Sequence, residues 1–68
     1  VVYPNPTSGV LYLSDGLSNV KLFDVTGREV YSASDMVNSI DLTQVVSGVY
    51  MLIAFDGEKY ISTKIVKD

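Results

Sequence analysis

Turn-forming residues recur at short, even intervals along the whole chain. Between them lie runs of four to eight residues rich in Val, Ile, Leu, Tyr and Phe, which are typical of strands. The expected strands start near residues 10, 19, 28, 38, 48 and 58. Spacing of about 8–12 residues is typical of sandwiches and barrels built from hairpins, and no segment sustains a helical period. We therefore expect an all-β fold.

Two dipeptides predict hairpins. Asp56-Gly57 lies between two apolar runs and predicts a type I′ turn, in which both central residues have positive φ. Thr26-Gly27 is a second, weaker hairpin signal. The stretch 42–47 has room for one helical turn. Such a small sandwich has open strand edges, so self-association through edge strands is also expected.

Alternation leaves one choice of buried face open. In the run from Val10 to Leu13 both alternating pairs are apolar, so either Leu11 and Leu13 or Val10 and Tyr12 point inward.

Length and composition exclude most chemistry. The chain has 68 residues, which is enough for a single domain over residues 1–68. It contains no Cys and no His, so disulfide frameworks, thiol enzymes and the commonest general base and metal ligand are excluded. We expect no cofactor and no bound metal.

Charge and hydropathy narrow the partners. The net charge is −3, whereas binding to nucleic acid requires a basic surface. The longest apolar run, 49–55, is far shorter than a membrane span. The last ten residues carry three Lys and one Asp, which indicates either protection of an edge strand or a recognition element.

The carboxylates and tyrosines have ordinary structural explanations. Asp24 and Glu29 flank one predicted turn, and Asp56 and Glu58 flank the other. Asp commonly caps its own turn, so a hydrolase built on these carboxylate pairs is disfavoured, and Asp24→Asn or Asp41→Asn would test it. Asp15, Asp35 and Asp41 are scattered and form no calcium-binding loop. Five Tyr are many for this length, and a sugar-stacking platform is the alternative to simple packing. Its members would be Tyr12, Tyr31 and Tyr60.

One strand is apolar on both faces. Val49, Met51, Ile53 and Phe55 alternate with the equally apolar Tyr50, Leu52 and Ala54. Such a strand is either central in a sandwich or covered by a partner. The first set is therefore a candidate apolar contact face.

Four groups of residues together resemble a known pattern. They are Tyr3-Pro4-Asn5-Pro6-Thr7-Ser8-Gly9, then 20–30, then Ile40-Asp41-Leu42-Thr43 before Ser47-Gly48-Val49-Tyr50, and finally Lys64-Ile65-Val66-Lys67. In this order and spacing the whole chain resembles the C-terminal sorting domain of the type IX (Por) secretion system, type A family, found in Bacteroidota. Each group alone is common; the four in register are not.

The resemblance implies a fold and a function. The fold would be an immunoglobulin-like antiparallel β-sandwich of about seven short strands. The function would be that of a non-enzymatic export signal, which directs a cargo protein from the periplasm through the outer-membrane translocon to the cell surface or medium. A shuttle protein and a surface sortase would be further partners, and the sortase usually removes the domain. A start at Val1, without Met, fits the last module of a longer secreted protein.

The resemblance also assigns recognition residues. Pro4 and Pro6 would give a rigid entry, Gly9 the turn into the next strand, and Gly27 a positive φ. Gly48 would open the strand in which Tyr50 anchors the core. Lys64 to Lys67 would form the terminal strand that the machinery requires, so deletion of residues 59–68 should trap the cargo in the periplasm. The full set is Pro4, Asn5, Pro6, Gly9, Asp24, Gly27, Arg28, Gly48, Tyr50, Lys64, Ile65, Val66 and Lys67.

Two departures from the family pattern and one alternative remain. Ile53 stands where the family often has a polar residue, and Asp68 stands where a Lys or Gln is common. The first departure strengthens the case for an apolar contact surface. The alternative function is an accessory sandwich of a surface protein that binds carbohydrate or acts as a spacer.

Overall fold

The computed structural model describes residues 2–3 and 8–68, which form strands and turns with no helix among them. The strands are β1 (Val2–Tyr3), β2 (Val10–Phe23), β3 (Glu29–Ala33), β4 (Val37–Asp41), β5 (Gly48–Phe55) and β6 (Tyr60–Lys67). All their pairings are antiparallel. The all-β antiparallel class predicted from turn spacing is confirmed.

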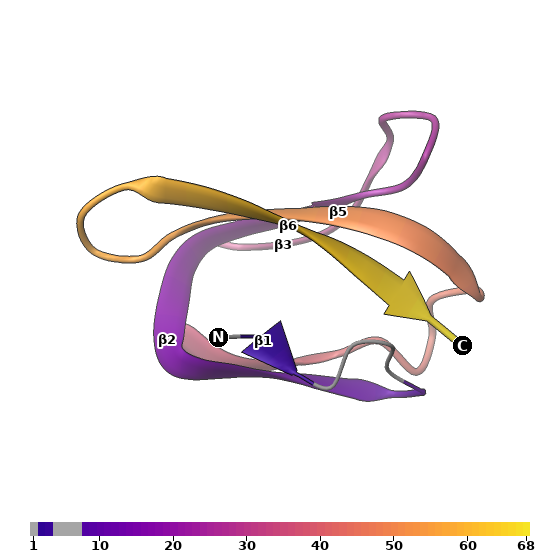
Figure 1. Ribbon diagram of the computed structural model, residues 1–68, viewed down its shortest axis with the longest axis horizontal. Helices are drawn as coiled ribbons and strands as arrows, with labels where there is room; N and C mark the ends of the chain where they lie inside the picture. Colours follow the sequence, from indigo (N-terminus) through magenta and orange to yellow (C-terminus); the bar gives the residue numbers. More distant parts are fainter. Residues whose placement is uncertain (1, 4–7) are drawn as a thin grey trace.

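The long strand β2 belongs to two layers (Figure 1). Its N-terminal half pairs with β1 and β4, which together form layer A. Its C-terminal half pairs with β3 and β5, and β6 joins β5 at the edge; these strands form layer B. Figure 1 shows β2 curling from one layer into the other. The described strands therefore number six instead of the predicted seven, because no break occurs near residue 19.

The curl of β2 has a local cause. The pairing register of this strand shifts within 12–17 and again within 18–21. Gly16 and Asn19 lie in these two segments with φ of 74° and 49°, a backbone conformation that bends a strand. Gly16 is also enclosed, because a Cβ there would lie 3.1 Å from side-chain atoms of Met36 and Asn38. Glycine at position 16 is therefore required both for its φ and for its size.

A single apolar core lies between the two layers. Leu11 and Leu13 are in it, whereas Val10 and Tyr12 are exposed, which resolves the alternative left open by the sequence. The outward position leaves the Tyr12 hydroxyl in water. The buried members of the core are Leu11, Leu13, Leu17, Val20, Leu22, Ile40, Leu42, Tyr50, Leu52, Ala54 and Ile65.

Both predicted hairpins are present, but the type I′ turn is wrong. Among Asp56, Gly57 and Glu58 only Gly57 has a positive φ, of 104°. The Asp56 amide donates to the Lys59 carbonyl over 3.0 Å. The Asp56 Oδ1 accepts the amides of Glu58 and Lys59 at 2.8 and 3.0 Å, so this side chain fixes the turn. In the stretch 42–47 the Val45 amide donates to the Leu42 carbonyl, which makes a turn and no helix.

Candidate recognition surface

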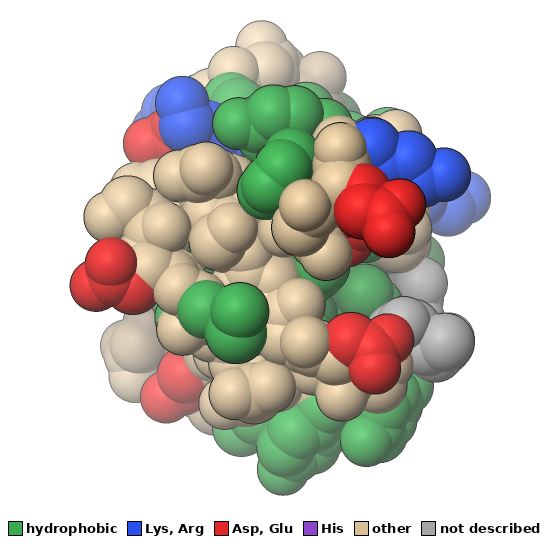
Figure 2. All heavy atoms as spheres, turned by 90° about the vertical axis from the view of Figure 1, so that its left-hand side faces the viewer, with side chains coloured by type: hydrophobic (Ala, Val, Ile, Leu, Met, Phe, Trp, Pro, Cys, Tyr) green, Lys and Arg blue, Asp and Glu red, His purple; other side chains and the backbone are tan. Residues whose placement is uncertain are grey.

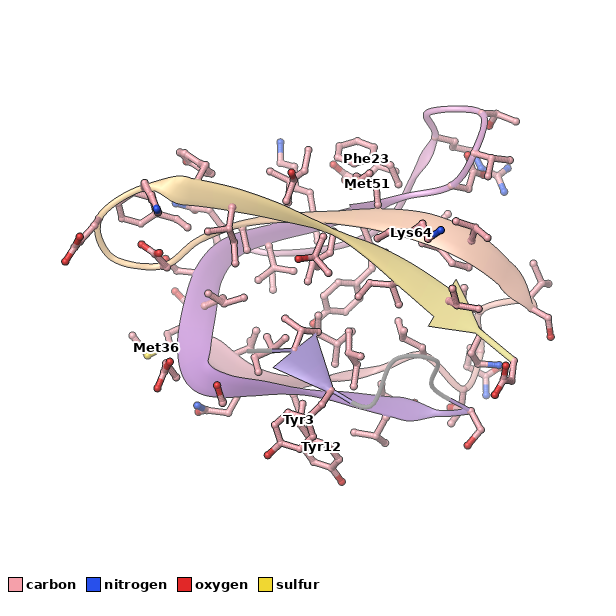
Figure 3. The ribbon with its side chains drawn as sticks, in the orientation of Figure 1. Tyr3, Tyr12, Phe23, Met36, Met51 and Lys64 are labelled. Carbon is pink, nitrogen blue, oxygen red and sulfur yellow. The ribbon has the colours of Figure 1, made fainter. Side chains whose placement is uncertain are left out.

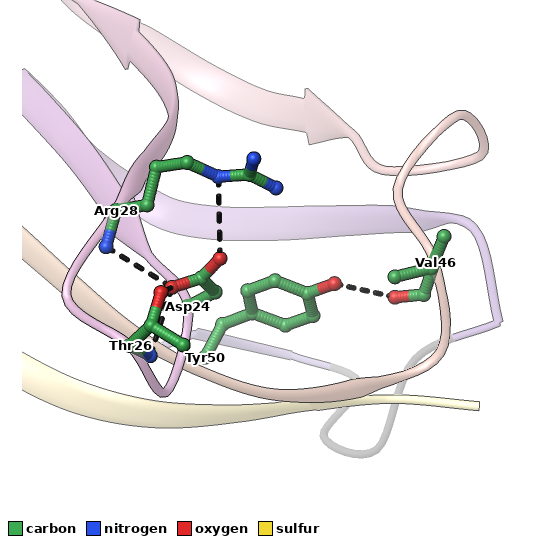
Figure 4. A network of polar contacts seen from close by, with 5 residues as sticks. All are labelled: Asp24, Thr26, Arg28, Val46 and Tyr50. Atoms are coloured by element: carbon green, nitrogen blue, oxygen red, sulfur yellow. Dashed lines mark hydrogen bonds and ion pairs between the residues drawn. The ribbon is translucent and has the colours of Figure 1, made fainter.

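The Asp24–Arg28 hairpin is held by one carboxylate (Figure 4). Asp24 Oδ1 accepts the Thr26 amide at 2.9 Å, the Thr26 hydroxyl at 2.6 Å and the Arg28 amide at 3.0 Å. The Arg28 Nε lies 3.4 Å from Asp24 Oδ2. Gly27 has the predicted positive φ, 88°, as expected after a type I turn in a three-residue hairpin loop. The predicted capping role of Asp24 is confirmed.

These hydrogen bonds lower the pKa of Asp24, first through the Thr26 hydroxyl and then through the Arg28 amide. Asp41 behaves in the same way, because the hydroxyl and amide of Thr43 donate to its Oδ1 at 2.6 and 2.9 Å and lower its pKa. A carboxylate with a lowered pKa is a poor proton acceptor. Asp24 and Asp41 therefore serve their turns.

Tyr50 anchors the core, as predicted. Its side chain is buried, and its hydroxyl donates to the Val46 carbonyl at 2.5 Å (Figure 4). Gly48 begins β5 and pairs with Lys67 of β6. This end of β5 is where the chain enters layer B from the turn at 42–47.

Several motif residues meet at this end of the molecule. Asp24, Arg28, Gly48 and Tyr50 line one surface depression of about 400 Å³, together with residues 44–47. Asp24 and Tyr50 also line a neighbouring depression with Lys64. These five residues, from three separate motif groups, are hereafter the motif end. Sequence reasoning did not predict that they would be adjacent, because they come from the β2–β3 hairpin, β5 and β6.

Other motif residues lie elsewhere. Pro4, Asn5 and Pro6 lie outside the described residues. Gly9 precedes β2, and its carbonyl accepts the Leu42 amide at 2.8 Å. Its φ is not positive; instead, a Cβ would lie 3.2 Å from the Thr43 methyl group, so close approach is the reason for a small residue.

The terminal strand contributes mainly to the fold. β6 pairs with β5 along its whole length. Ile65 is completely buried, Val66 is half-buried, and Lys67 is largely buried with its Nζ 3.1 Å from the Asp68 backbone oxygen. Of the four motif residues in β6, Lys64 alone is exposed. A recognition role for this strand stays a prediction, and Lys64 is the side chain best placed for it.

The predicted apolar contact face lies on the outside of layer B. Val49 and Met51 are exposed, whereas Ile53 and Phe55 are half-buried. Figure 3 shows Met51, Phe23 and Lys64 on this outer side, away from the core. Phe55 packs on Tyr60 with 5.1 Å between ring centroids. The stripe is therefore partly solvent-exposed, as a contact face must be.

The alternative of a sugar-stacking platform is wrong, because its three tyrosines do not lie together. Tyr12 lies on the outer face of layer A, where it pairs with Tyr3, 5.8 Å between ring centroids (Figure 3). Tyr31 is half-buried against the core, and Tyr60 is on the outer face of layer B. The reason is topological, since the three residues come from strands that face three different ways. Within the described ranges, no three acidic side chains gather as a metal site would require.

Comparison with known families identifies the chain. The model of the secretion system C-terminal sorting domain matches residues 1–68, so the chain belongs to this family of type IX secretion sorting domains. A search of curated proteins found no match. Membership implies a C-terminal sorting signal for type IX export, contact with the secretion machinery, and a destination at the cell surface or outside the cell. The part of the chain that the structure describes has no helix able to cross a membrane.

Proposed function

We propose that this module carries an attached cargo protein from the periplasm through the outer-membrane translocon, without catalysing any reaction itself. The observation that supports the proposal most is the family match over all of residues 1–68. The sorting-domain family is not a family of enzymes. Asp24 and Asp41 are engaged in turns, and their lowered pKa values make them poor general bases.

In this proposal the signal is a folded surface and not a linear tail. The motif end gathers residues of the β2–β3 hairpin, β5 and β6, so it exists only when these strands of layer B have paired. A shuttle protein and the translocon are the partners that would contact this surface. A surface sortase would then remove the domain from the mature cargo.

A fusion experiment tests the proposal. A stable periplasmic reporter with an ordinary signal peptide is joined to residues 1–68 and expressed in a host that has the type IX system. We expect the reporter at the cell surface, measured by protease accessibility on intact cells. The reporter without the domain, and the fusion in a translocon-deficient strain, should both remain in the periplasm.

The same fusion tests cleavage and the folded-surface model. Mass spectrometry of the surface product should find the reporter without residues 8–68. Leu52→Asp places a charge in the core and should abolish export together with the fold, because Leu52 is completely buried. Surface delivery of the fusion in the translocon-deficient strain would contradict the proposed function, and surface delivery of an unfolded Leu52→Asp domain would contradict the folded-surface model.

A further inference from the structure

The outer face of layer B combines apolar side chains with lysines in a regular arrangement. Two neighbouring rows cross it, one made of Phe23, Met51 and Lys64 and the other of Lys21, Ile53 and Ser62. Each row has an apolar residue of β5 at its centre, and the two lysines stand on opposite sides of β5. These six residues define the layer B face.

The apolar centre of this face is accessible. Met51 is 43% exposed and Val49, two residues before it on the same side of β5, is 42% exposed. The outer face of a layer is normally solvated, and layer A also exposes Tyr3, Val10 and Tyr12. What distinguishes the layer B face is that its exposed apolar side chains are adjacent and flanked by charged residues, an arrangement typical of interaction surfaces. The face is continuous with the motif end, because Val49, Met51, Tyr50 and Lys64 line one depression of about 310 Å³.

Charge is divided unequally between the two layers. Every Lys and Arg of the chain lies in a layer B strand or in a hairpin joining such strands. The strands and loops of layer A carry Asp15, Asp35 and Asp41 and no basic residue. In Figure 2 the Lys and Arg side chains accordingly lie in the upper part of the view, level with layer B.

The six residues of the layer B face include Lys21 and Lys64 and no acidic residue. Two acidic residues lie at its margin. Glu29 is opposite Phe23, and Asp24 lines the depression with Met51 and Lys64 but is already paired with Arg28. Thus a domain with a net charge of −3 presents lysines on both sides of its exposed apolar stripe. The complementary surface is an apolar patch flanked by carboxylates.

We propose that the layer B face docks a protein of the export machinery that presents an apolar patch flanked by acidic side chains. This inference rests on the proposed function and specifies which surface of the domain is recognised. The plane of the layers spans 30 × 16 Å between Cα atoms. A face of this size is at the low end of protein interfaces, so the complex is transient, as suits a signal that must be released.

Paired substitutions on the two outer faces test the proposal in the reporter fusion. Met51→Glu places a carboxylate at the centre of the layer B face and should lower surface delivery at least about tenfold, since an unpaired charge would be buried on docking. The matched control is Tyr12→Glu, because Tyr12 is similarly exposed, at 46%, on the outer face of layer A. It should retain wild-type delivery.

A charge series tests the acidic character of the partner. Lys21→Glu should lower delivery several-fold by placing like charges opposite each other, whereas Lys21→Arg should retain it. Lys21 is exposed, so substitutions there should leave the fold intact. This series therefore tests docking at the layer B face even if Met51→Glu fails to fold. Circular dichroism and thermal unfolding of each purified domain establish that the fold is intact.

The outcomes separate the two proposals. If the wild-type fusion never reaches the surface, the proposed function fails. If the wild type is delivered and folded Met51→Glu and Lys21→Glu are delivered equally well, the docking proposal is overturned. Equal losses for Tyr12→Glu and Met51→Glu would also overturn it, because recognition would not be confined to layer B. A further outcome would overturn the proposal: the wild-type domain is a dimer in sedimentation, and Met51→Glu dissociates this dimer without loss of delivery. The layer B face would then bind a second copy of the domain.

Discussion

The Tyr50 hydroxyl donates a hydrogen bond to the Val46 carbonyl oxygen, 2.5 Å away, across the turn through which the chain enters layer B. The Tyr50 ring is buried in the core, so the same residue fixes both the packing of β5 and the path of the preceding backbone. A tyrosine near the start of a strand that bonds the backbone a few residues upstream is a recurrent feature of β-sandwiches. This contact explains in physical terms why a Gly-Val-Tyr sequence opens β5.

Tyr50→Phe should destabilise the domain by about 1 kcal/mol, because the ring is kept and only the hydrogen bond is lost. Tyr50→Ala should cost about 3–5 kcal/mol, since it also leaves a cavity in the core. Urea unfolding followed by circular dichroism measures both. Tyr60→Phe is the control, because Tyr60 is exposed and no change beyond about 0.5 kcal/mol is expected there. Equal stability of Tyr50→Phe and Tyr60→Phe would contradict the anchoring role.

The bend in β2 gives a second prediction. Gly16 and Gly27 both have positive φ, but a Cβ at Gly27 would meet nothing within 4 Å, whereas a Cβ at Gly16 would crowd Met36 and Asn38. Gly27→Ala should therefore cost about 1 kcal/mol, from backbone strain alone. Gly16→Ala should cost about 2–3 kcal/mol, because overpacking adds to strain.

The comparison is made by urea unfolding of the two variants under identical conditions. The double variant Gly16→Ala/Met36→Ala should recover part of the loss, because it removes the flexible side chain nearest to the new methyl group. If Gly16→Ala is no worse than Gly27→Ala, crowding at the bend is not a determinant of the fold.

Local signals in the sequence predicted the strands and turns well. They predicted less of how strands that are distant in the sequence lie together. The even spacing of turns predicted most strand positions and the antiparallel class. The run 49–55 is apolar on both faces, so alternation could not predict that Tyr50, Leu52 and Ala54 would be its buried set. The missing break near residue 19 has a different origin. Asn19 follows a Gly-Leu-Ser sequence that reads as a turn, but Gly16 and Asn19 bend the strand without ending it.

The individual residues of the candidate site were predicted, but their proximity in space was not. The family resemblance named Asp24, Gly48 and Tyr50, but only the pairing of the end of β2 with β5, with Phe23 opposite Met51, brings the Asp24 hairpin beside the start of β5. The turn at Asp56-Gly57 failed for a smaller reason. The Asp56 carboxylate accepts two loop amides and so selects another turn, and dipeptide preference does not include this competition.

Acid should destabilise the domain through its turns. The pKa values of Asp24, Asp41 and Asp56 are lowered from 3.8, chiefly by the Thr26 hydroxyl, the Thr43 hydroxyl and the Lys59 amide respectively. Groups with a lowered pKa stabilise the fold above about pH 4, and this stabilisation is lost as the pH falls through their folded-state pKa values. Thermal unfolding from about pH 7 to about pH 2.5 should show a nearly constant midpoint and then a decline in the acid range.

Asp24→Asn should make this decline shallower, because one of the linked protonations is removed. Thr26→Ala removes the hydroxyl that contributes most to the lowered pKa of Asp24, so it should lower stability at neutral pH and likewise make the decline in acid shallower. A wild-type profile that stays flat throughout the acid range would show that the three carboxylates do not stabilise their turns.

The terminal strand gives the last prediction, which separates folding from recognition. Ile65 is completely buried, so Ile65→Ala should cost about 2–4 kcal/mol of unfolding free energy. Lys64 is exposed, and Lys64→Ala should change stability by less than about 0.5 kcal/mol. Deletion of residues 59–68 removes all of β6 and exposes one edge of β5 together with its core contacts, so that domain should not unfold cooperatively.

Export of the same variants completes the test. A loss of surface delivery after the deletion would reflect a lost fold and would say nothing of recognition. A loss of delivery in Lys64→Ala, with an unfolding curve like that of the wild type, would assign recognition to that side chain. Lys59→Ala is the matched control, because Lys59 is an exposed lysine of the β5–β6 hairpin outside the layer B face. Delivery that falls with Lys64→Ala but not with Lys59→Ala would place the signal at Lys64. If Lys64→Ala is delivered as well as the wild type, this strand acts through the fold alone, because Ile65 and Lys67 point inward and Val66 is half-buried.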